Sequence, residues 1–593
     1  MAEILQQNNE IIDFDILING NKIKDTIEVQ EITIEMEVNR ITSAIIVIND
    51  GATNEHFANS EGKDFIPGSK IEVSLGNTDK TEKVFRGIIV SQRLKMKGDT
   101  THLTVTCKDK AVTMTKGRYN AIYQNNKDSD AIKALASKYA LNFEMDTTTV
   151  EHSVLMQHNC SDWDYLVMRA EANNMLVTTY QNKLSVKKID LSPEPKVELK
   201  ASQNVIDIDL SLESENISGA YNMSSWNPNT QEIVTSSLAI KDVLSQGNLS
   251  AKKLSDVLGN SSNYYSSASL SKDEMEIWLE SQANMAALEK IKGKITVLGT
   301  TKIKAGDIIM LSEFSARFNG NAFISKITHN LQNGEWFTEL HLGKSAKQNA
   351  TLNDVEDIGA SGLIPALKGP QIAKVKQIIE DPDSNYRILV TLPTFKGIAQ
   401  EDGIWARLAI PYATKGAGFF FFPERGDEVL LTFINNDPRF PVITGSMYST
   451  KNTPKETLNE KNQFKSIYSK SGIKIRFDDE DKILSIETPS KNTIVLDDKN
   501  KSVSIKDMHE NSIVMNHSGI TMKTPKDINL KADGNINLKA SANLAMKATA
   551  DAMLDGFSIT QNAQTSFKAT GNASAELSAS GETTVKGAMV MIN

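Results

Sequence analysis

The stretch DINLKADGNINLKASANLAMKATADAMLDG, which runs from Asp527 to Gly556, repeats with a period of eight residues. One phase holds large apolar residues, a second holds lysine, and a third holds alanine or glycine. An eight-residue unit has room for one short strand and one turn, and it cannot bury an apolar face alone. An α-helical array would instead repeat every 7 or 11 residues, roughly. The apolar phase that we expect to fill a needle core consists of Leu530, Leu538, Met546 and Leu554.

The repeat favours a shaft that is built by three chains. A β-helix closed within one chain needs roughly 18 or more residues per turn and a wide interior. Here single Leu, Met or Ile residues lie close to Ala and Ser, which suits a narrow prism in which each chain donates one face per rung. Such a prism has no free strand edges along its shaft. We therefore predict an intertwined triple-stranded β-helix in a homotrimer, with Lys531, Lys539 and Lys547 in a solvated column.

Composition limits the possible classes of protein. The chain has 593 residues and a formal net charge of −9, and its length predicts several domains. The acidity and the absence of an Arg/Lys cluster argue against a nucleic-acid partner. Cys107 follows Leu103 and Val105 in strand phase and is expected to be a core residue. No signal-peptide pattern and no integral membrane segment is evident, so we expect synthesis in the cytoplasm.

Residues 1–346 read as two β-rich parts with a few helices. Alternating apolar residues predict strands, whereas residues 128–140 and 161–174 have helical periodicity. Ser161 with Asp164 is a capping pair, and a further helix is expected after Ser271. Residues 227–271 are rich in Ser and Asn, and we expect a long loop or extended arm there.

The rest of the chain divides into four segments. Residues 347–368 are polar and then Gly/Pro-punctuated, which predicts a linker. Residues 369–450 hold short strands, GFFFFP among them, with turns rich in Gly, Asp, Asn and Pro, and they predict a small OB-fold barrel. Residues 451–470 form a connector, and residues 471–593 form the β-helical needle.

Motifs in the barrel carry a family resemblance. Between Trp405 and Ser449 the sequence contains WAR, FPE, GDEV, NDP and GSMY, and in this pattern it resembles the OB barrel of VgrG-type spike proteins of contractile injection systems. SDWDYLVMRAE at 161–171 and the ending KGAMVMIN are similar to the hub and needle parts of the same family. The resemblance makes the motif residues structural rather than catalytic: Trp405, Arg407, Gly418, Pro423, Gly426, Asp427, Glu428, Asp437, Pro438, Gly445 and Tyr448. Gly418, Gly426 and Gly445 are expected in turns, and Trp405 in or beside the barrel.

The resemblance implies a mainly β fold with minor α. Residues 1–346 would be a phage hub-like region of two barrel-like subdomains that docks on the inner tube. The function implied is mechanical, because a contracting sheath drives tube and spike through a target envelope. The partners implied are two further copies of the chain, the inner tube protein, baseplate proteins, a PAAR-type tip cap and effectors. Type VI secretion machines and extracellular phage-tail-like particles use similar spikes, and both fit; the spike would be exported or released with its particle.

The last residues of the needle are apolar. An exposed apolar end shared by three chains invites a cap, whereas simple termination with some fraying is the alternative. The residues expected to bind the tip cap are Met589, Val590, Met591, Ile592 and Asn593.

The sequence gives no sign of catalysis. About 20 residues separate barrel and shaft, too few for an enzyme domain. We find no catalytic set and expect no cofactor, and no metal at the tip, because the last histidine is His517. His509 and His517 could form rings in a trimer that hold an ion, although turn histidines are the simpler interpretation. A trimeric surface fibre or adhesin with a β-helical shaft, and an enzyme with an unseen site, are the alternatives; a fibre needs neither the hub nor the OB pattern.

Overall fold

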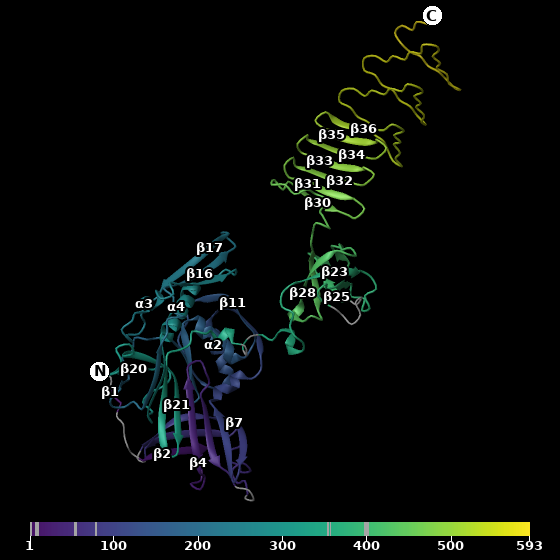
Figure 1. Cartoon of the computed structure of the whole chain (residues 1–593). Helices are drawn as coiled ribbons and strands as arrows, with labels where there is room; N and C mark the ends of the chain where they lie inside the picture. Colours follow the sequence, from purple (N-terminus) through teal and green to yellow (C-terminus); the bar gives the residue numbers. More distant parts are fainter. Residues whose placement is uncertain are drawn as a thin grey trace. The chain divides into compact units, whose positions relative to one another are not determined.

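The computed structural model describes residues 3–5, 11–51, 56–77, 80–352, 355, 357–395 and 403–592. The chain forms two units, Met1–Ser446 and Met447–Asn593, which are described separately below. Strands dominate the first unit and form the early part of the second, and the helices of the described residues all lie in the first (Figure 1). The mainly β fold with minor α that we expected is confirmed.

Most of the first unit is built on one fourteen-stranded sheet. β4 (Val29–Glu37) pairs antiparallel with β21 (Gly320–Gln332), and Figure 1 shows the two strands side by side. The two β-rich parts expected in residues 1–346 therefore share a sheet. Its other strands are β1 (Glu3–Ile4), β2 (Ile12–Ile18), β3 (Asn21–Lys22), β5 (Ser43–Asn49), β6 (Lys70–Asn77), β7 (Lys80–Lys97), β8 (Thr100–Lys108), β14 (Val197–Lys200), β15 (Asp207–Leu212), β19 (Ile291–Leu298), β20 (Ile308–Ser312) and β22 (Glu335–Leu342).

Alternate residues of this sheet fill the main core. Leu103, Val105 and Cys107 of β8 are all buried, as are Ile32 and Ile34 of β4, because successive side chains of a strand point to opposite faces. The prediction of a core position for Cys107 is confirmed. Burial raises the pKa of the Cys107 thiol to about 12, so this cysteine stays protonated and unreactive at neutral pH.

Helices begin where the capping residues predict. α2 (Asp162–Ala172) starts after Ser161, whose Oγ accepts a hydrogen bond from the Asp164 amide at 3.1 Å. α4 (Lys272–Glu289) starts after Ser271, whose Oγ accepts from the Glu274 amide at 3.2 Å. α1 (Asp128–Ala136) precedes them in the chain, and α2 contacts both α1 and α4.

The expectation of a loop or arm over residues 227–271 is wrong. This segment holds β17 (Glu232–Ala239), α3 (Ala251–Ser255) and β18 (Ser261–Ser266), and both strands pair with β16 (Ala220–Asn227). The Tyr264 ring meets Trp278 of α4 edge-on at 4.5 Å between ring centroids. Packing of this sheet against α4 stabilises strands whose Ser-rich composition has little strand propensity of its own.

Smaller sheets complete residues 1–346. β9 (Tyr119–Lys127) and β11 (Glu151–Cys160) form a two-stranded ribbon in which Met156 lies opposite Ile122. One face of the ribbon is buried at Leu155, whereas Met156 and Ile122 are exposed on the other. A second small sheet contains β10 (Asn142–Met145), β12 (Met175–Tyr180) and β13 (Lys183–Lys188).

The segment 347–368 is hydrogen-bonded at both of its ends. The Asn349 amide donates to Glu171 Oε2 at 2.8 Å, and the Leu367 amide donates to the Asn436 carbonyl at 2.8 Å. The described part of this expected linker therefore contacts α2 near its start and the 3-10 turn Ile434–Asn436 near its end.

A closed five-stranded barrel follows, which confirms the barrel predicted from the run of short strands and turns. Its core is formed by alternate apolar residues, among them Val375, Val390, Ala406, Val429 and Ile443. The strands close in the order β23 (Gln371–Gln377), β24 (Ile388–Thr391), β25 (Ile404–Leu408), β29 (Pro441–Ser446) and β28 (Glu428–Phe433).

The prediction of a strand at GFFFFP is wrong. A short hairpin of β26 (Ala413–Thr414) and β27 (Ala417–Gly418) comes first, and Phe419, Phe420 and Phe421 then lie outside any strand. These three side chains are 49%, 79% and 63% exposed. Five other strands already close the barrel, so the phenylalanine run has no ladder to join.

The second unit begins with a seven-stranded antiparallel meander. Beyond Lys523 the chain runs as extended segments, and among the described residues there none pairs with another (Figure 1). Bends recur at 533–534, 541–542, 549–550, 557, 564–565, 572–573, 580–581 and 588–589, so the eight-residue period is present almost to the end. The strands of the meander are β30 (Phe464–Tyr468), β31 (Lys474–Asp478), β32 (Ile483–Glu487), β33 (Thr493–Asp497), β34 (Ser502–Lys506), β35 (Ser512–Asn516) and β36 (Gly519–Lys523).

Candidate functional site

The WAR motif lies on the barrel wall. Ala406 points into the core and is fully buried, whereas Trp405 and Arg407, one position away on either side, point outward from β25. Trp405 is half-buried and lies opposite Leu389 of β24, so it packs beside the barrel rather than in it.

The FPE and GDEV motifs build the turn that leads into β28. The Glu424 amide donates to Asp427 Oδ2 at 2.8 Å, and the Asp427 amide donates to the Glu424 carbonyl at 3.0 Å. The Gly426 amide donates to the Val375 carbonyl of β23 at 2.8 Å. Pro423 is half-buried beside this turn, and Glu428 is exposed at the first position of β28. The hydrogen bonds of Asp427 therefore hold this turn in its conformation.

The NDP motif forms a second turn that side-chain hydrogen bonds hold in place. Arg439 donates from Nε and Nη2 to the Asp437 carboxylate, at 3.0 Å to Oδ1 and 2.6 Å to Oδ2. Asp437 is buried, Pro438 is half-buried, and the guanidinium of Arg439 holds the pKa of the Asp437 carboxyl below its usual range. The charge of Asp437 is thus used to shape the β28–β29 connection.

The motif glycines do not all lie in turns. Gly426, with φ +94°, is in the turn before β28. The turn expected at Gly418 is wrong: this residue is the last of β27, opposite Ala413, with φ +143°, and a Cβ there would come within 2.6 Å of the Tyr412 carbonyl oxygen. The turn expected at Gly445 is wrong: this residue lies inside β29, next to a register shift against β28. Tyr448, in the second unit, is 76% exposed.

Gly426 and Gly445 give a matched pair for mutation. No atom lies within 4 Å of a Cβ built on either, and only Gly426 has a positive φ. We expect Gly426→Ala to lower the free energy of unfolding by about 1–2 kcal/mol through backbone strain. Gly445→Ala should change it by less than about 0.5 kcal/mol. Chemical unfolding curves of the full chain compare the two variants, and equal losses would contradict the role of the turn.

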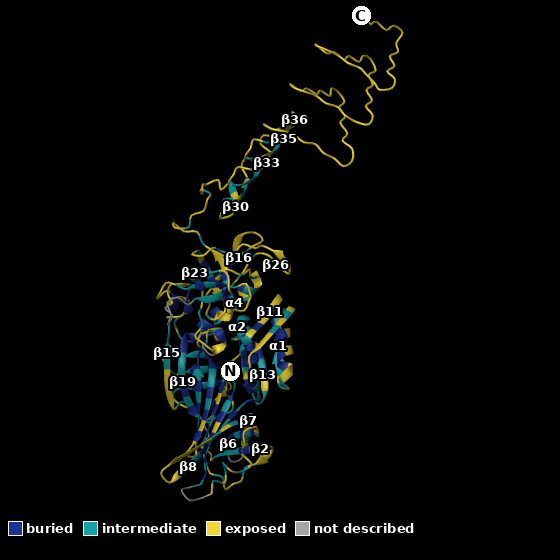
Figure 2. Ribbon diagram, turned by 90° about the vertical axis from the view of Figure 1, so that its right-hand side faces the viewer, coloured by how far each residue is buried: buried dark blue, intermediate teal, exposed yellow. Residues whose placement is uncertain are grey.

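The needle-core residues are uncovered in the single chain. Leu530, Leu538, Met546 and Leu554 are 69%, 64%, 82% and 66% exposed. Figure 2 colours the chain from residue 530 to residue 554 as exposed. A run of large apolar side chains open to water is unfavourable unless another surface covers it.

The meander also has an uncovered face. A hollow of about 890 Å³ lies on it, lined in part by Ile494, Ile505, Ile513 and Met522. His509 lines the same hollow, whereas His517 lies in the β35–β36 turn with Nε2 3.1 Å from Ser518 Oγ. The two histidines thus have different surroundings within one chain.

The expected tip residues are exposed as far as the structure describes them. Met589, Val590, Met591 and Ile592 are 80%, 48%, 77% and 91% exposed. Asn593 lies outside the described residues. Four consecutive open side chains form an apolar end.

Family models match both folded regions of the first unit. The model described as the Alg8 N-terminal domain matches residues 8–333, more than half of the 593-residue chain. The chain belongs to this family. The model described as the Type VI secretion system/phage-baseplate injector OB domain matches residues 371–448 of this Alg8-family chain, which include all five barrel strands.

Curated relatives match over shorter stretches. The actin cross-linking toxin VgrG1 of Vibrio cholerae is 33% identical over 101 residues, which are 16% of this chain and 9% of the toxin. The type VI secretion system spike protein VgrG1a of Pseudomonas aeruginosa is 29% identical over 130 residues, which are 20% of each chain. The matches therefore span a fifth or less of these relatives. With the OB-domain match, they confirm the resemblance to VgrG-type spike proteins.

Solved structures of tail and secretion proteins are similar at low identity. The 43 kDa tail protein of prophage MuSo2 from Shewanella oneidensis has a TM-score of 0.44 at 10% identity, covering 56% of this chain and 99% of its own. The E. coli c3393 protein, a type VI secretion component, has a TM-score of 0.38 at 12% identity, covering 73% of this chain and 99% of its own.

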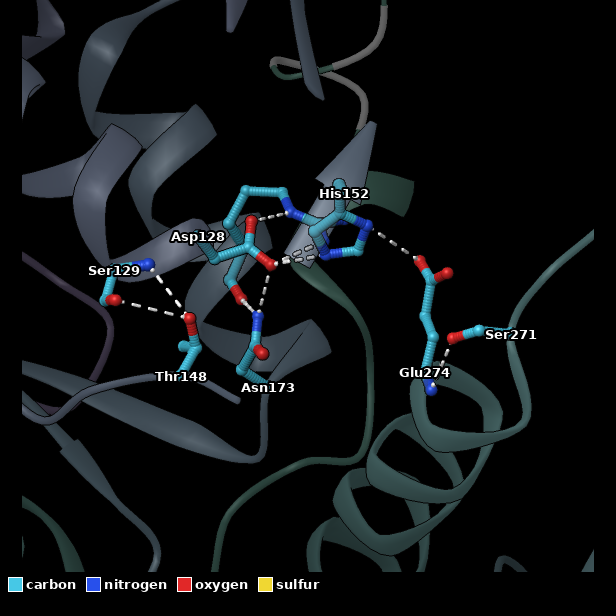
Figure 3. Close-up of polar contacts among 8 residues, drawn as sticks. Asp128, Ser129, Thr148, His152, Asn173, Ser271 and Glu274 are labelled. Carbon is cyan, nitrogen blue, oxygen red and sulfur yellow. Dashed lines mark hydrogen bonds and ion pairs between the residues drawn. The ribbon is translucent and has the colours of Figure 1, made fainter. Parts of the chain in front are cut away.

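A buried polar network in the Alg8-family region was missed by sequence reasoning. Arg169 of α2 donates from Nε and Nη2 to Asp128, the first residue of α1, at 2.6 and 2.8 Å. Asn173 Nδ2 donates to the same carboxylate at 2.8 Å, and His152 Nε2 lies 3.1 Å from it. Figure 3 shows His152 between Asp128 and Glu274 of α4, with its Nδ1 3.8 Å from Glu274 Oε1. The network ties together α1, β11, α2 and α4.

The network holds a charged carboxylate inside the protein. The Asp128 side chain is fully buried, and burial alone would raise its pKa. The hydrogen bonds and charge of Arg169, the hydrogen bond from Asn173 and the neighbouring His152 together outweigh that effect and lower the pKa of Asp128 below the usual range. No helix in the described part of the chain is long and apolar enough to cross a membrane.

Proposed function

We propose that the chain is the spike of a contractile injection apparatus and works as a homotrimer. In this role it caps the inner tube, punctures the target envelope and carries a tip cap or effectors. The observation that carries the proposal is an injector-type OB barrel followed in the same chain by a bend every eight residues.

In a trimer, neighbouring chains would supply the backbone hydrogen bonds and apolar contacts that a single chain lacks. Backbone N–H and C=O groups need hydrogen-bond partners, and the described residues beyond Lys523 form no ladder with one another. The large apolar residues of the repeat are exposed at the same time. Neighbouring copies that supply strands and apolar faces at each rung would satisfy both needs, and they would cover the hollow on the meander.

The proposed role is mechanical rather than enzymatic. A shaft that is held by interchain hydrogen bonds along its whole length resists unfolding kinetically, because many bonds have to break together. A puncturing device needs that property. The motif residues of the barrel support this role, since Asp427 and Asp437 are used to lock turns.

The proposed partners bind two regions of the chain, residues 1–346 and the exposed apolar side chains of residues 589–592. Residues 1–346 dock on the inner tube and baseplate proteins, and the exposed side chains from Met589 to Ile592 seat a PAAR-type cap. The spike assembles in the cytoplasm and leaves with its particle, through a type VI secretion machine or as part of a released phage-tail-like particle.

Deletion of the gene tests this function. Particles purified from the deletion strain should lack a tip density, and full-length protein supplied in trans should restore it. An antibody against an epitope inserted at the exposed turn Asp498–Lys501 should label one end of each particle in electron micrographs. Label spread over the cell surface, with normal particles after deletion, would favour the fibre and contradict the spike.

A further inference from the structure

A cavity of about 520 Å³ lies beside the polar network of residues 1–346. Its walls come from β11, α2 and the N-terminal half of α4, with Met223 of β16 and residues 348 and 350 at its side. This volume lies in the range of about 300–1,000 Å³ that is usual for ligand sites. The residues that line the cavity do not belong to the barrel, the needle or the tip.

The cavity has the lining of a site for a large apolar group. Met156, Met168 and Met223 contribute flexible thioether side chains, and Ile277 and Trp278 contribute the wall from α4. Methionine adapts to irregular partners and is frequent at protein-binding surfaces. Met156 is 60% exposed on the open face of the β9–β11 ribbon.

One polar group in the wall has no partner. The Tyr165 side chain lines the cavity and is 3% exposed, and its hydroxyl makes no hydrogen bond to any described residue. A buried hydroxyl without a partner is unfavourable. An occupant with a polar atom beside its apolar group would remove this cost.

Carboxylates line the cavity and a neighbouring hollow. Glu171 and Glu274 line the cavity itself. Asp273, Glu276 and Glu280 line a second hollow along α4, and Ile277 is shared by both. The basic residue Arg169 of the first cavity is already neutralised by Asp128. Three lysines offset part of the acidic charge: Lys344 lies 4.0 Å from Glu171, Lys272 lies 3.6 Å from Glu276, and Lys241 lines the second hollow. The other carboxylates, Glu274, Asp273 and Glu280, still favour a positively charged partner.

We propose that this cavity and the adjoining face of α4 are a docking site for a basic polypeptide segment of a partner protein. One large apolar side chain of the segment enters the cavity, and lysine or arginine residues next to it meet the carboxylates of α4. The inference goes beyond the proposed spike function and does not depend on the trimer.

A defined peptide tests the site on the full chain. The probe is a fluorescently labelled Lys-Lys-Ser-Phe-Ser-Lys-Lys peptide, followed by anisotropy, with one control in which Gly replaces Phe and another in which Glu replaces every Lys. We expect saturable binding of the probe alone, weakened by salt because the charges are exposed. Equal binding of either control peptide, or no binding of the probe, would overturn the proposal.

Two variants on the ribbon provide the matched control. Met156→Trp fills the mouth of the cavity, whereas Ile122→Trp changes the exposed residue opposite it, which does not line the cavity. Both positions are exposed, so both variants should fold and melt like the unchanged protein. We expect Met156→Trp to weaken binding about tenfold and Ile122→Trp to leave it unchanged. Equal effects of the two variants would overturn the site.

Discussion

Replacing Arg169 with leucine should lower the free energy of unfolding by about 3–5 kcal/mol. The substitution leaves Asp128 buried and charged, with only Asn173 and His152 as partners. Chemical unfolding followed by tryptophan fluorescence measures the loss in the first unit alone, because the last tryptophan of the chain is Trp405. The cost is large because an uncompensated charge inside a protein is far less stable than the same charge in water.

An exposed ion pair supplies the control. Lys22 Nζ lies 2.7 Å from Asp15 Oδ1, with the lysine side chain 59% exposed, so Lys22→Met should leave the unfolding curve nearly unchanged. A loss for Arg169→Leu no larger than that for Lys22→Met would show that the network is not a support of the fold.

The network around Asp128 should also make the free energy of unfolding depend on pH. The pKa of Asp128 is lowered in the folded protein, so its contribution to stability is present above its unfolded value of 3.8 and is lost as pH falls through the folded pKa. Without Arg169, burial raises the pKa of Asp128, and protonation then relieves the buried charge. The stability difference between the unchanged protein and Arg169→Leu should therefore begin to narrow above pH 3.8, where Asp128 of the folded variant takes up its proton, and should narrow further below pH 3.8, where the unchanged protein loses stability. A constant difference from pH 7 to pH 3 would contradict this assignment.

Replacing Leu538 with aspartate should abolish assembly of the needle. In the proposed trimer three copies of this position meet at one level of a narrow core, so one substitution buries three like charges. Sedimentation velocity of the full-length variant should show single chains or a loosened species in place of the trimer.

Lys539 is the matched control for this substitution. It is the next residue and belongs to the lysine column expected to face solvent. Lys539→Gln should sediment as the unchanged protein does. An intact trimer carrying Leu538→Asp would mean that Leu538 does not face the core, and the assignment of phases in the repeat would then be wrong.

Local signals in the sequence were sufficient for several elements. Ser161 and Ser271 each placed the start of a helix, because a cap is set by residues within one turn. The alternation through Cys107 placed a core strand, and the eight-residue period of the needle reappears in its bends. The run of short strands and turns over residues 369–450 was sufficient for a small closed barrel, although it included a strand at GFFFFP that the structure does not have.

Features that depend on distant partners were not visible in the sequence. The strands from Glu232 to Ser266 form because their sheet packs on α4. Their Ser-rich composition does not indicate strands, so the sequence alone did not predict them. The phenylalanines at 419–421 looked like a strand, although their place in a ladder depended on strands elsewhere in the barrel. Asp128 and Arg169 are 41 residues apart, and neither position carries a local sign of the pair.

The mass of the purified full-length protein by light scattering, beside a version truncated after Tyr448, tests the central claim most directly. One chain has a mass of 65.3 kDa, and we expect the full-length protein near three times that value, with weaker assembly after truncation. A well-folded full-length protein with the mass of one chain would contradict the interlocked needle, and with it the spike function.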